Sequence, residues 1–313
     1  MNWPFLIYIF VNAAFALLIS PFYMSLIKKI KAWTQRRKGP PLFQTYYNIA
    51  KLMKKEVVYS SNSSWIMRTT PYANMIAVLA AAMFVPLAFV PQGFDGVGNI
   101  ILFVYLLAVA RFFMALSGLD AGSTFGGMGS SREMSLSAII EPTTIVVFAA
   151  LAFTFKTTNL HEIFTETAKF PAFVMNPSLF LISIPLFLVI IVETARVPVD
   201  NPETHLELTM IHEAMILEQS GRNLALMELS SAVKQTLLTG VLVNVLMPWG
   251  LATEFTLQAI LFSMLAFFAK AAAISIIIGL FESALAKIRL FLLPHIFMLA
   301  FFLSVLAILL EVF

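Results

Sequence analysis

Long apolar runs separated by polar segments are the feature that most constrains how this chain can fold. Each run is long enough to cross a hydrocarbon layer of ~30 Å as an α-helix. About eight are present, near residues 5–27, 71–91, 99–117, 136–155, 178–193, 226–249, 257–280 and 291–312. We therefore predict an all-α fold, a polytopic membrane bundle of about eight transmembrane helices, with residues 1–313 forming a single membrane domain.

The composition supports this class and excludes others. Of 313 residues, 60% are hydrophobic and 12% charged, whereas a soluble domain carries roughly 25% charged residues. No basic residue precedes the first apolar run, so we expect a retained span rather than a cleaved signal. The net charge of +3 is local to certain loops and does not indicate nucleic-acid binding. With no cysteine, disulfides and ordinary iron–sulfur clusters are excluded, so redox cofactors would belong to partners.

The distribution of basic residues predicts the topology. Cytoplasmic loops of membrane proteins carry an excess of Lys and Arg. Alternate connections place Lys156 and Lys169 on one side and sixteen basic residues on the other: Lys28, Lys29, Lys31, Arg36, Arg37, Lys38, Lys51, Lys54, Lys55, Arg68, Arg132, Arg196, Arg222, Lys234, Lys287 and Arg289. Both termini should therefore lie outside, and the long loops 28–70, 118–135 and 194–225 should face the cytoplasm. Within the first loop, residues 41–55 have the spacing of a short interfacial helix.

Four charged residues fall within or at the end of the apolar runs: Arg111, Glu141, Glu193 and Lys270. A charge at membrane depth costs at least ~2.5–3.5 kcal/mol on insertion scales, so such residues are usually paired or functional. One interpretation is a structural ion pair, with Arg111 or Lys270 bound to Glu141. The other is a row of titratable groups that passes protons or a coupled charge along the membrane.

A second concentration of charge lies in the segment 193–222, ETARVPVDNPETHLELTMIHEAMILEQSGR. It contains six of the seventeen acidic residues, namely Glu193, Asp200, Glu203, Glu207, Glu213 and Glu218. Glu203 and Glu207 are four residues apart on an expected helix face, where like charges repel, so one of them should hold its proton more tightly. The apolar residues between these acids indicate burial against another surface.

The same segment does not carry a metal motif. His205 and His212 are seven residues apart, whereas helical zinc motifs place two histidines four apart. We therefore predict no metal site. The Gly/Ser-rich segment 118–133 lacks the Lys-Ser/Thr ending of a phosphate-binding loop, and we expect a tight loop that packs against a partner.

Two stretches resemble a known family. ETARVPVDNPETHLEL and HEAMILEQSGR are similar to the loop after the fifth helix in subunit 1 of respiratory complex I, where the pattern is roughly E-T-N-R-x-P-F-D-L-P-E-x-E-x-E-L…E-Y-S-G. RRKGPPLFQTYYNIAKLMKKE, residues 36–56, resembles the family's R-x-G-P…Q…K-L-x-K-E segment. Arg132 and Glu141 also match. The positions that match in the acidic segment are Glu193, Arg196, Pro198, Asp200, Pro202, Glu203, Glu207, Glu218, Ser220 and Gly221.

Departures from the pattern favour one branch of this family. Ala195 replaces the usual Asn, Val199 the usual Phe and His205 an acid. The segment 110–136, ARFFMALSGLDAGSTFGGMGSSREMSL, is closer to the hydrogenase branch, which includes formate hydrogenlyase subunit 4, hydrogenase-4 component C and the anchor subunit of archaeal membrane-bound hydrogenases. The resemblance implies a membrane anchor beneath hydrogenase-type large and small subunits and an Fe–S protein, beside antiporter-like membrane subunits. [NiFe] and Fe–S clusters would sit on those partners and none on this chain.

This resemblance implies a role for the charged residues. We expect a proton or charge relay formed by Arg111, Glu141, Glu193, Asp200, Glu203, Glu207, Glu213, Glu218 and Lys270. We expect charge balance or partner docking from Arg36, Arg37, Arg132, Arg196 and Arg222. The chain would then be the ion-coupling subunit of an energy-converting hydrogenase or formate-hydrogenlyase-type complex in a prokaryotic inner membrane, itself without catalytic residues.

Two alternatives remain open on the sequence. The chain could be a quinone-site membrane subunit of a complex I-type NADH:quinone oxidoreductase, although the altered Asn and Phe positions count against this. It could also be a free-standing ion or solute transporter. The acidic segment with its interleaved apolar residues, suited to burial beneath a partner, disfavours the transporter.

Overall fold

The computed structural model describes residues 3–90, 98–169, 177–201, 210–252 and 256–312. All the regular structure in these ranges is helical. The helices are α1 (Trp3–Thr34), α2 (Gln44–Met53), α3 (Trp65–Ala81), α4 (Ile100–Asp120), α5 (Thr124–Phe155), α6 (Leu160–Lys169), α7 (Pro177–Glu193), α8 (His212–Ile216), α9 (Gly221–Leu246), α10 (Leu257–Ala284), the 3-10 turn η2 (Leu290–Leu292) and α11 (Leu293–Val312). The predicted all-α membrane fold is confirmed.

Each of the eight predicted apolar runs contains a helix. Six helices in the described residues are long and apolar enough to span a membrane, namely α1, α4, α5, α9, α10 and, with the turn η2, α11. Helix α7 is apolar but shorter, and α3 has 17 residues. The short helix predicted within residues 41–55 is α2, and its side chains are at most partly buried.

The second run ends earlier than its hydrophobicity predicted. Helix α3 stops at Ala81 instead of residue 91, and an irregular segment follows. Pro86 cannot donate a backbone hydrogen bond, so it favours this break. Asn12 of α1 provides hydrogen bonds to backbone groups that have no helical partner in this segment. Its side-chain NH₂ donates to the carbonyls of Ala82 (2.6 Å) and Val85 (2.8 Å), and its side-chain oxygen accepts from the Leu87 N–H (2.8 Å). The Asn244 amide donates to the Pro86 carbonyl at 2.9 Å. Irregular backbone is tolerated at membrane depth when protein groups satisfy it in this way.

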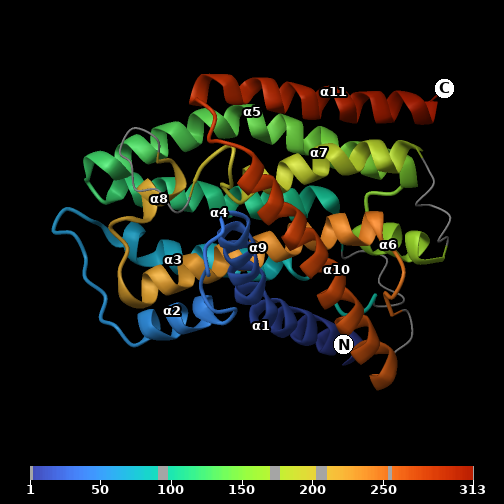
Figure 1. Cartoon of the computed structure of the whole chain (residues 1–313), viewed down its shortest axis with the longest axis horizontal. Helices are drawn as coiled ribbons and strands as arrows, with labels where there is room; N and C mark the ends of the chain where they lie inside the picture. The colour runs from blue at the N-terminus through green and yellow to red at the C-terminus, as the bar shows by residue number, and fades with distance from the viewer. Residues whose placement is uncertain (1–2, 91–97, 170–176, 202–209, 253–255, 313) are drawn as a thin grey trace.

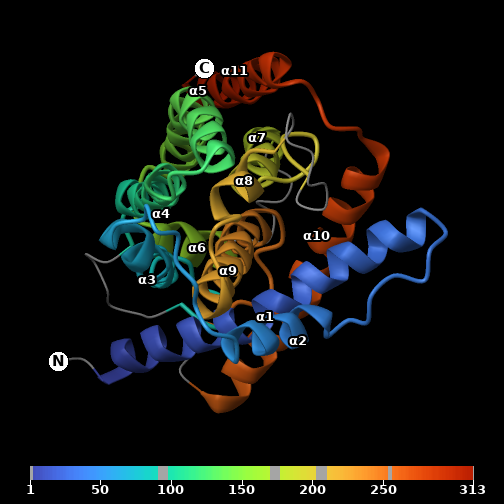
Figure 2. The same cartoon turned by 90° about the vertical axis from the view of Figure 1, so that its left-hand side faces the viewer.

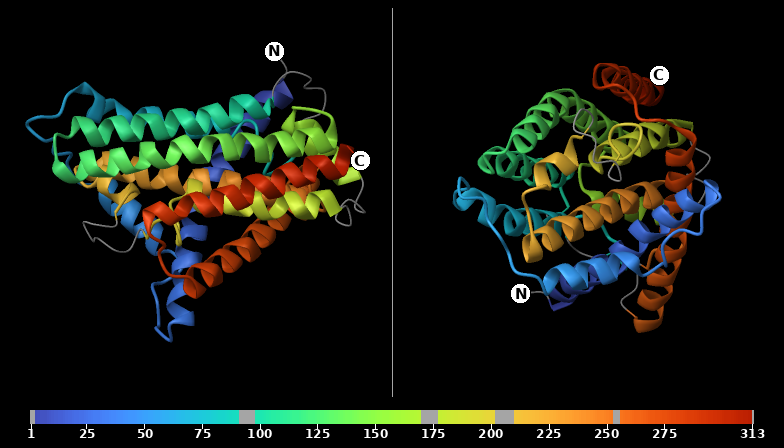
Figure 3. Two further views of the ribbon diagram at one scale, coloured as in Figure 1. Left: turned by 90° about the horizontal axis from the view of Figure 1, so that it is seen from above. Right: turned by 60° about the vertical axis from the view of Figure 1, so that its left-hand side comes forward.

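The helices are arranged around α9. Of the spanning helices, α9 is the most buried, and it contacts α1, α2, α3, α7 and α10. Figure 2 shows α9 between α3, α7, α10 and α1. On one side α4, α5, α7 and α11 run along the length of the bundle (Figures 1 and 3), and neighbours in this group are in contact.

The segment 118–135, predicted as a loop, is mostly helical. Helices α4 and α5 are joined by residues 121–123 alone, and the Ser123 side chain caps α5 by accepting from the Gly126 N–H. Glycine here permits close helix packing rather than a loop, as is common between membrane helices. A Cβ at Gly126 would lie 2.3 Å from the Gly118 carbonyl oxygen, and one at Gly129 would lie 2.8 Å from the Ala214 Cβ of α8.

The polar segments between the helices meet at one end of the bundle. The Ser64 N–H donates to Asp120 at 2.9 Å, and the Val58 N–H donates to the Ser220 hydroxyl at 2.8 Å. Helices α2 and α8 lie toward this end, whereas α6, the start of α1 and the finish of α11 lie toward the other (Figures 1 and 3). We call the first the polar end and the second the terminal end.

Candidate functional site

A cluster of charged side chains lies between the spanning helices. Arg111 of α4 is 5% exposed and contacts carboxylates from two other helices. Its Nε lies 3.6 Å from Glu133 and its Nη1 lies 3.5 Å from Glu141, both on α5, and its Nη2 pairs with Glu193 at the end of α7. Arg111 also donates to the Ser137 hydroxyl at 3.2 Å. The structure therefore brings three of the four predicted membrane-depth charges together.

Lys234 of α9 extends this cluster to a fourth helix. Its ammonium lies 2.6 Å from the second oxygen of Glu193, and both side chains are largely buried. We call Arg111, Glu133, Glu141, Glu193 and Lys234 the buried charge cluster. Glu193 is its centre, because each of its two oxygens pairs with a different cation.

Sequence reasoning missed two members of the buried charge cluster. Lys234 entered the prediction only as an orientation charge, and Glu133 was not singled out. The spacing of Glu133 and Glu141 was an available signal, because residues eight apart in a helix lie within one broad stripe of its surface. The sequence alone could not show that Lys234 faces α7.

The acids of the cluster differ in exposure. Glu193 is buried, with 3% of its side chain exposed, whereas 47% of the Glu141 side chain is exposed. Because α5 is a spanning helix with an apolar surface, Glu141 presents a carboxylate outward from an otherwise hydrophobic region. Glu141 is thus the most exposed member of the cluster.

A small cavity lies between the buried charge cluster and His212 of the acidic segment. It has a volume of about 20 Å³, enough for about one water molecule, and His212 at the start of α8 lines it beside three members of the cluster. The lining residues are Asn74, Ala110, Arg111, Met114, Glu193, His212, Met227, Ser230, Ser231 and Lys234. His212 of the acidic segment and three members of the buried charge cluster therefore line the same cavity.

Glu213, next to His212, is an acid of the predicted relay with a shifted pKa. Burial is the main cause and raises the pKa of its carboxyl, and the nearby charges of Glu228 and Asp200 raise it further. His212 and Lys28 act in the opposite direction. Glu213 therefore holds its proton to a higher pH than a solvated glutamate does.

We expect Glu213→Gln to change the pH dependence of stability. A carboxyl whose pKa is higher in the folded than in the unfolded state stabilises the fold below its ordinary pKa, and this contribution is lost as pH rises through the folded pKa. Glutamine does not ionise, so the variant does not lose stability in this way as pH rises. Relative to the wild type, its unfolding midpoint should therefore rise by roughly 2–4 °C between pH 4.5 and pH 8. Thermal scans of the purified complex measure this, with the exposed Glu218→Gln as control. A constant difference across the range would contradict the assignment.

Asp200 connects two parts of the acidic segment that are eleven or twelve residues apart. The side chain is 2% exposed and accepts hydrogen bonds from the backbone N–H groups of Asn201 (2.8 Å), Ile211 (3.1 Å) and His212 (3.0 Å). Its Oδ1 also lies 2.5 Å from the Lys287 ammonium. These contacts hold residues 200 and 211 together across the stretch that contains Glu203 and Glu207, which lie outside the described residues.

Arg196 and Arg132 fix the same segment from its flanks. Arg196 is buried, donates to the Gln235 side chain at 3.0 Å and pairs with Glu282 of α10 at 2.8 Å. Glu282 also lies 3.6 Å from Lys31 of α1. Arg132 donates to the Met210 carbonyl at 2.8 Å. Both arginines were predicted as charge-balancing groups, but Gln235, Glu282 and Lys31 were not predicted.

The remaining predicted residues lie apart from the buried charge cluster. Lys270 donates to the carbonyls of Met247 (2.9 Å) and Trp249 (2.7 Å) beyond the end of α9, and its ammonium lies 5.0 Å from the Trp249 ring centroid. The predicted alternative pair of Lys270 with Glu141 is therefore not formed, and Arg111 takes that place. Glu218 and the arginines at 36, 37 and 222 are exposed. Within the described residues, no group of three or more His, Cys, Asp or Glu is placed to hold a metal ion.

These features define a class of protein: a polytopic membrane subunit with charges buried between its helices and a polar end suited to contact with other subunits. The sequence identifies the family. Residues 6–312 match the family described as NADH dehydrogenase, so the chain belongs to that family, as the resemblance predicted.

Known relatives favour the hydrogenase branch. The chain is 32% identical to hydrogenase-4 component C of Escherichia coli (strain K12) over 301 residues, 96% of this chain and 94% of the relative. It is 30% identical to formate hydrogenlyase subunit 4 of the same organism, over 93% of each chain. NADH-ubiquinone oxidoreductase chain 1 of Triticum aestivum is more distant, with 26% identity over 75% of this chain and 74% of the relative.

A solved structure shares the fold. It is a chain from the membrane-bound sulfane sulfur reductase, an archaeal respiratory membrane complex. It superposes with a TM-score of 0.83 over 97% of this chain and 99% of that chain, at 18% sequence identity. The likeness covers the whole bundle and shows that the two chains share one arrangement of helices.

Proposed function

We propose that this chain is the membrane anchor and ion-coupling subunit of an energy-converting hydrogenase or formate-hydrogenlyase-type complex in a prokaryotic inner membrane. Electron transfer would occur in a soluble arm of hydrogenase-type large and small subunits with an Fe–S protein, which hold the [NiFe] and Fe–S clusters. The higher identity to hydrogenase-4 component C and formate hydrogenlyase subunit 4 than to complex I chain 1 supports this branch.

The continuity between the polar end and the buried charge cluster carries this proposal. Glu213 and Asp200 lie at the polar end, and His212 and Glu193 both line the small cavity. From Glu193 the charges continue through Arg111 to the half-exposed Glu141. A change of charge in a docked redox arm would thus reach a carboxylate that faces out of the bundle.

The pairing of Glu193 suggests how charge moves. Its carboxylate balances Arg111 and Lys234 at once, so adding a proton to Glu193 leaves both cations with a deficit of negative charge. Arg111 would then be balanced by Glu133 and Glu141 alone. A change of charge at the centre of the cluster would therefore act on Glu141, the outward-facing acid, and on an antiporter-like neighbour beside it.

The test compares ion movement with redox turnover in the intact complex. Inverted membrane vesicles report proton uptake by a pH-sensitive dye and sodium uptake by ²²Na⁺, while hydrogen evolution reports turnover. We expect Glu193→Gln to lower the ions moved per hydrogen formed at least fivefold, because glutamine keeps the shape but cannot titrate. Glu193→Asp restores a carboxyl and should recover most of the coupling.

Matched variants separate coupling from general damage. Glu56→Gln removes an exposed carboxylate near the polar end that is not part of the predicted relay, and it should leave the ratio unchanged. Glu141→Gln should lower it, since Glu141 is the outward-facing acid. If Glu193→Gln and Glu141→Gln complexes assembled normally and moved as many ions per hydrogen as the wild type, the relay would be ruled out.

A second candidate function is a quinone-site subunit of a complex I-type oxidoreductase. The 26% identity to NADH-ubiquinone oxidoreductase chain 1 of Triticum aestivum favours it, though over a smaller part of the chain. Quinone-stimulated activity of the purified complex would support this candidate, whereas hydrogen evolution without quinone would support the first.

A further inference from the structure

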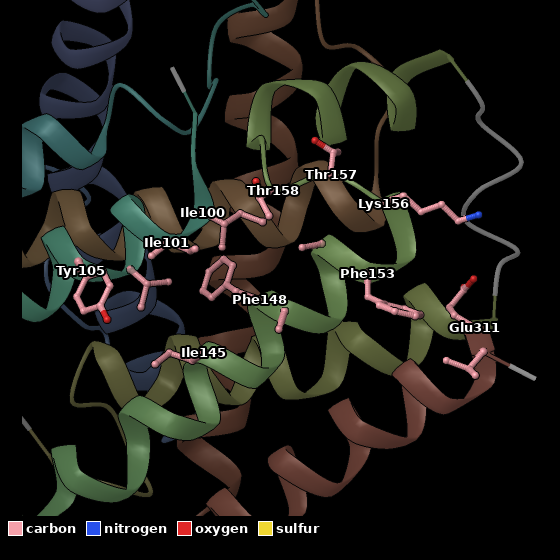
Figure 4. Close-up of a pocket in the computed structure, with 14 residues that line it drawn as sticks. Ile100, Ile101, Tyr105, Ile145, Phe148, Phe153, Lys156, Thr157, Thr158 and Glu311 are labelled. Carbon is pink, nitrogen blue, oxygen red and sulfur yellow. The ribbon is translucent and has the colours of Figure 1, made fainter. Parts of the chain in front are cut away.

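A large apolar groove lies far from the buried charge cluster, toward the terminal end. It is formed by the start of α4 and the last turns of α5 and α11 and encloses about 1230 Å³. This volume exceeds the ~300–1,000 Å³ of most small-molecule sites. Ile100, Val104, Ile145, Phe148 and Phe153 are among the side chains that line it (Figure 4), and most of the lining is apolar.

The depth of the groove matches one leaflet of a bilayer. The lining runs from Ile145 of α5 to Lys156, just beyond its end, which is eleven steps along the chain or about 16 Å at 1.5 Å per step. The hydrocarbon core of a bilayer is ~30 Å thick, so one leaflet contributes about 15 Å. Lys156 directly follows the last residue of α5, at the level where a spanning helix meets the headgroups. On the predicted topology this is the outer leaflet.

Two opposite charges stand at the mouth of the groove. Lys156 and Glu311 lie at the same end, away from Tyr105 and Ile145 (Figure 4). Both side chains are exposed, and within the described residues neither is engaged in an ion pair. Thr158 adds a hydroxyl group beside them, whereas the Thr157 hydroxyl already donates to Glu162. The mouth thus presents a cation, an anion and a hydroxyl group above an apolar slot.

We propose that this groove binds a zwitterionic phospholipid with an ammonium headgroup. The acyl chains fill the apolar slot, Lys156 pairs with the phosphate, and Glu311 pairs with the headgroup ammonium. An anionic headgroup would satisfy Lys156 but would be repelled by Glu311. The presence of two opposite charges also favours a lipid over an apolar helix of another subunit, because such a helix would leave both charges without a partner.

Native mass spectrometry of the purified intact complex tests this, after incubation with phosphatidylethanolamine or phosphatidylglycerol at equal concentration. We expect the complex to retain phosphatidylethanolamine at least fivefold more than phosphatidylglycerol. Ala149→Phe fills the groove and should remove one retained lipid per complex, whereas Ala269→Phe, the same change at an exposed position of α10, should not. Lys156→Gln leaves the packing intact and should lower retention, and Glu311→Gln should abolish the preference between the two lipids.

Other outcomes would overturn the proposal. Equal retention of the two lipids by the wild type would refute the headgroup assignment. Unchanged retention in both Ala149→Phe and Lys156→Gln would refute the site. A photo-reactive amino acid at position 149 that cross-links to another subunit, and not to lipid, would show that a polypeptide fills the groove.

Discussion

Replacing Arg111 by glutamine should destabilise the bundle by about 3–5 kcal/mol, the cost typical of removing one partner from a buried ion network. Arg111 is the residue that holds Glu133, Glu141 and Glu193 together. Without it, three carboxylates would share the single cation Lys234. The expected result is a large fall in the unfolding temperature of the purified complex and in its amount in membranes.

A double variant distinguishes charge from packing in this experiment. Arg111→Gln combined with Glu193→Gln restores the original net charge of the cluster, so it should recover part of the stability that the single variant loses. Arg36→Gln removes an exposed arginine and should change stability by less than about 0.5 kcal/mol. A double variant as unstable as, or less stable than, Arg111→Gln would show that lost packing, not charge, is the cause.

Replacing Asp200 by asparagine should open the base of the acidic segment. Asparagine keeps one oxygen but turns an NH₂ group toward either Lys287 or the backbone N–H groups of Ile211 and His212. Hydrogen bonds to charged groups contribute about 1.5–3 kcal/mol each. Loss of two should therefore raise local opening about a hundredfold or more, since 1.4 kcal/mol is a factor of ten.

Hydrogen exchange measured by mass spectrometry reports this opening on peptides that cover residues 210–216. Faster exchange should be confined to this region, and attachment of the soluble arm should weaken if these residues form its docking surface. The exposed Glu218→Gln is the control and should exchange like the wild type. Unchanged exchange in Asp200→Asn would mean that other contacts hold the segment closed.

Hydrophobicity was sufficient to predict the all-helical class and the approximate positions of the long helices. Each of the eight apolar runs contains a helix, because backbone groups in lipid must bond within their own segment, although the second run is helical only as far as Ala81. The prediction of a loop at residues 118–135 was wrong, because its composition is typical of a loop whereas its packing is that of helices. The Gly/Ser-rich residues 118–133 resemble a loop, but their missing side chains let α4, α5 and α8 approach closely.

The buried charge cluster could be predicted only in part. Arg111, Glu141 and Glu193 were recognised because a charge in an apolar run is unusual. The pair of Arg111 with Glu141 was one predicted interpretation, and it is formed. The partners Glu133 and Lys234 were not predicted, since a helix that is apolar on all sides has no clear polar stripe and its orientation cannot be deduced from spacing. Lys234 meets Glu193, and Glu282 meets Arg196, only because α9 and α10 pack in particular positions. The structure does not describe Glu203 and Glu207, whose role stays a prediction.

The contacts of Asn12 have a consequence for biogenesis. A single amide from α1 satisfies three backbone groups between Ala82 and Leu87, and Asn244, far later in the chain, satisfies a fourth. When the second hydrophobic segment leaves the translocon, the first must accompany it as a hairpin, or these groups enter lipid unpaired. The fourth group, the Pro86 carbonyl, has no partner until α9 has been synthesised. The nascent chain therefore completes this part of the membrane domain only after most of it has been synthesised.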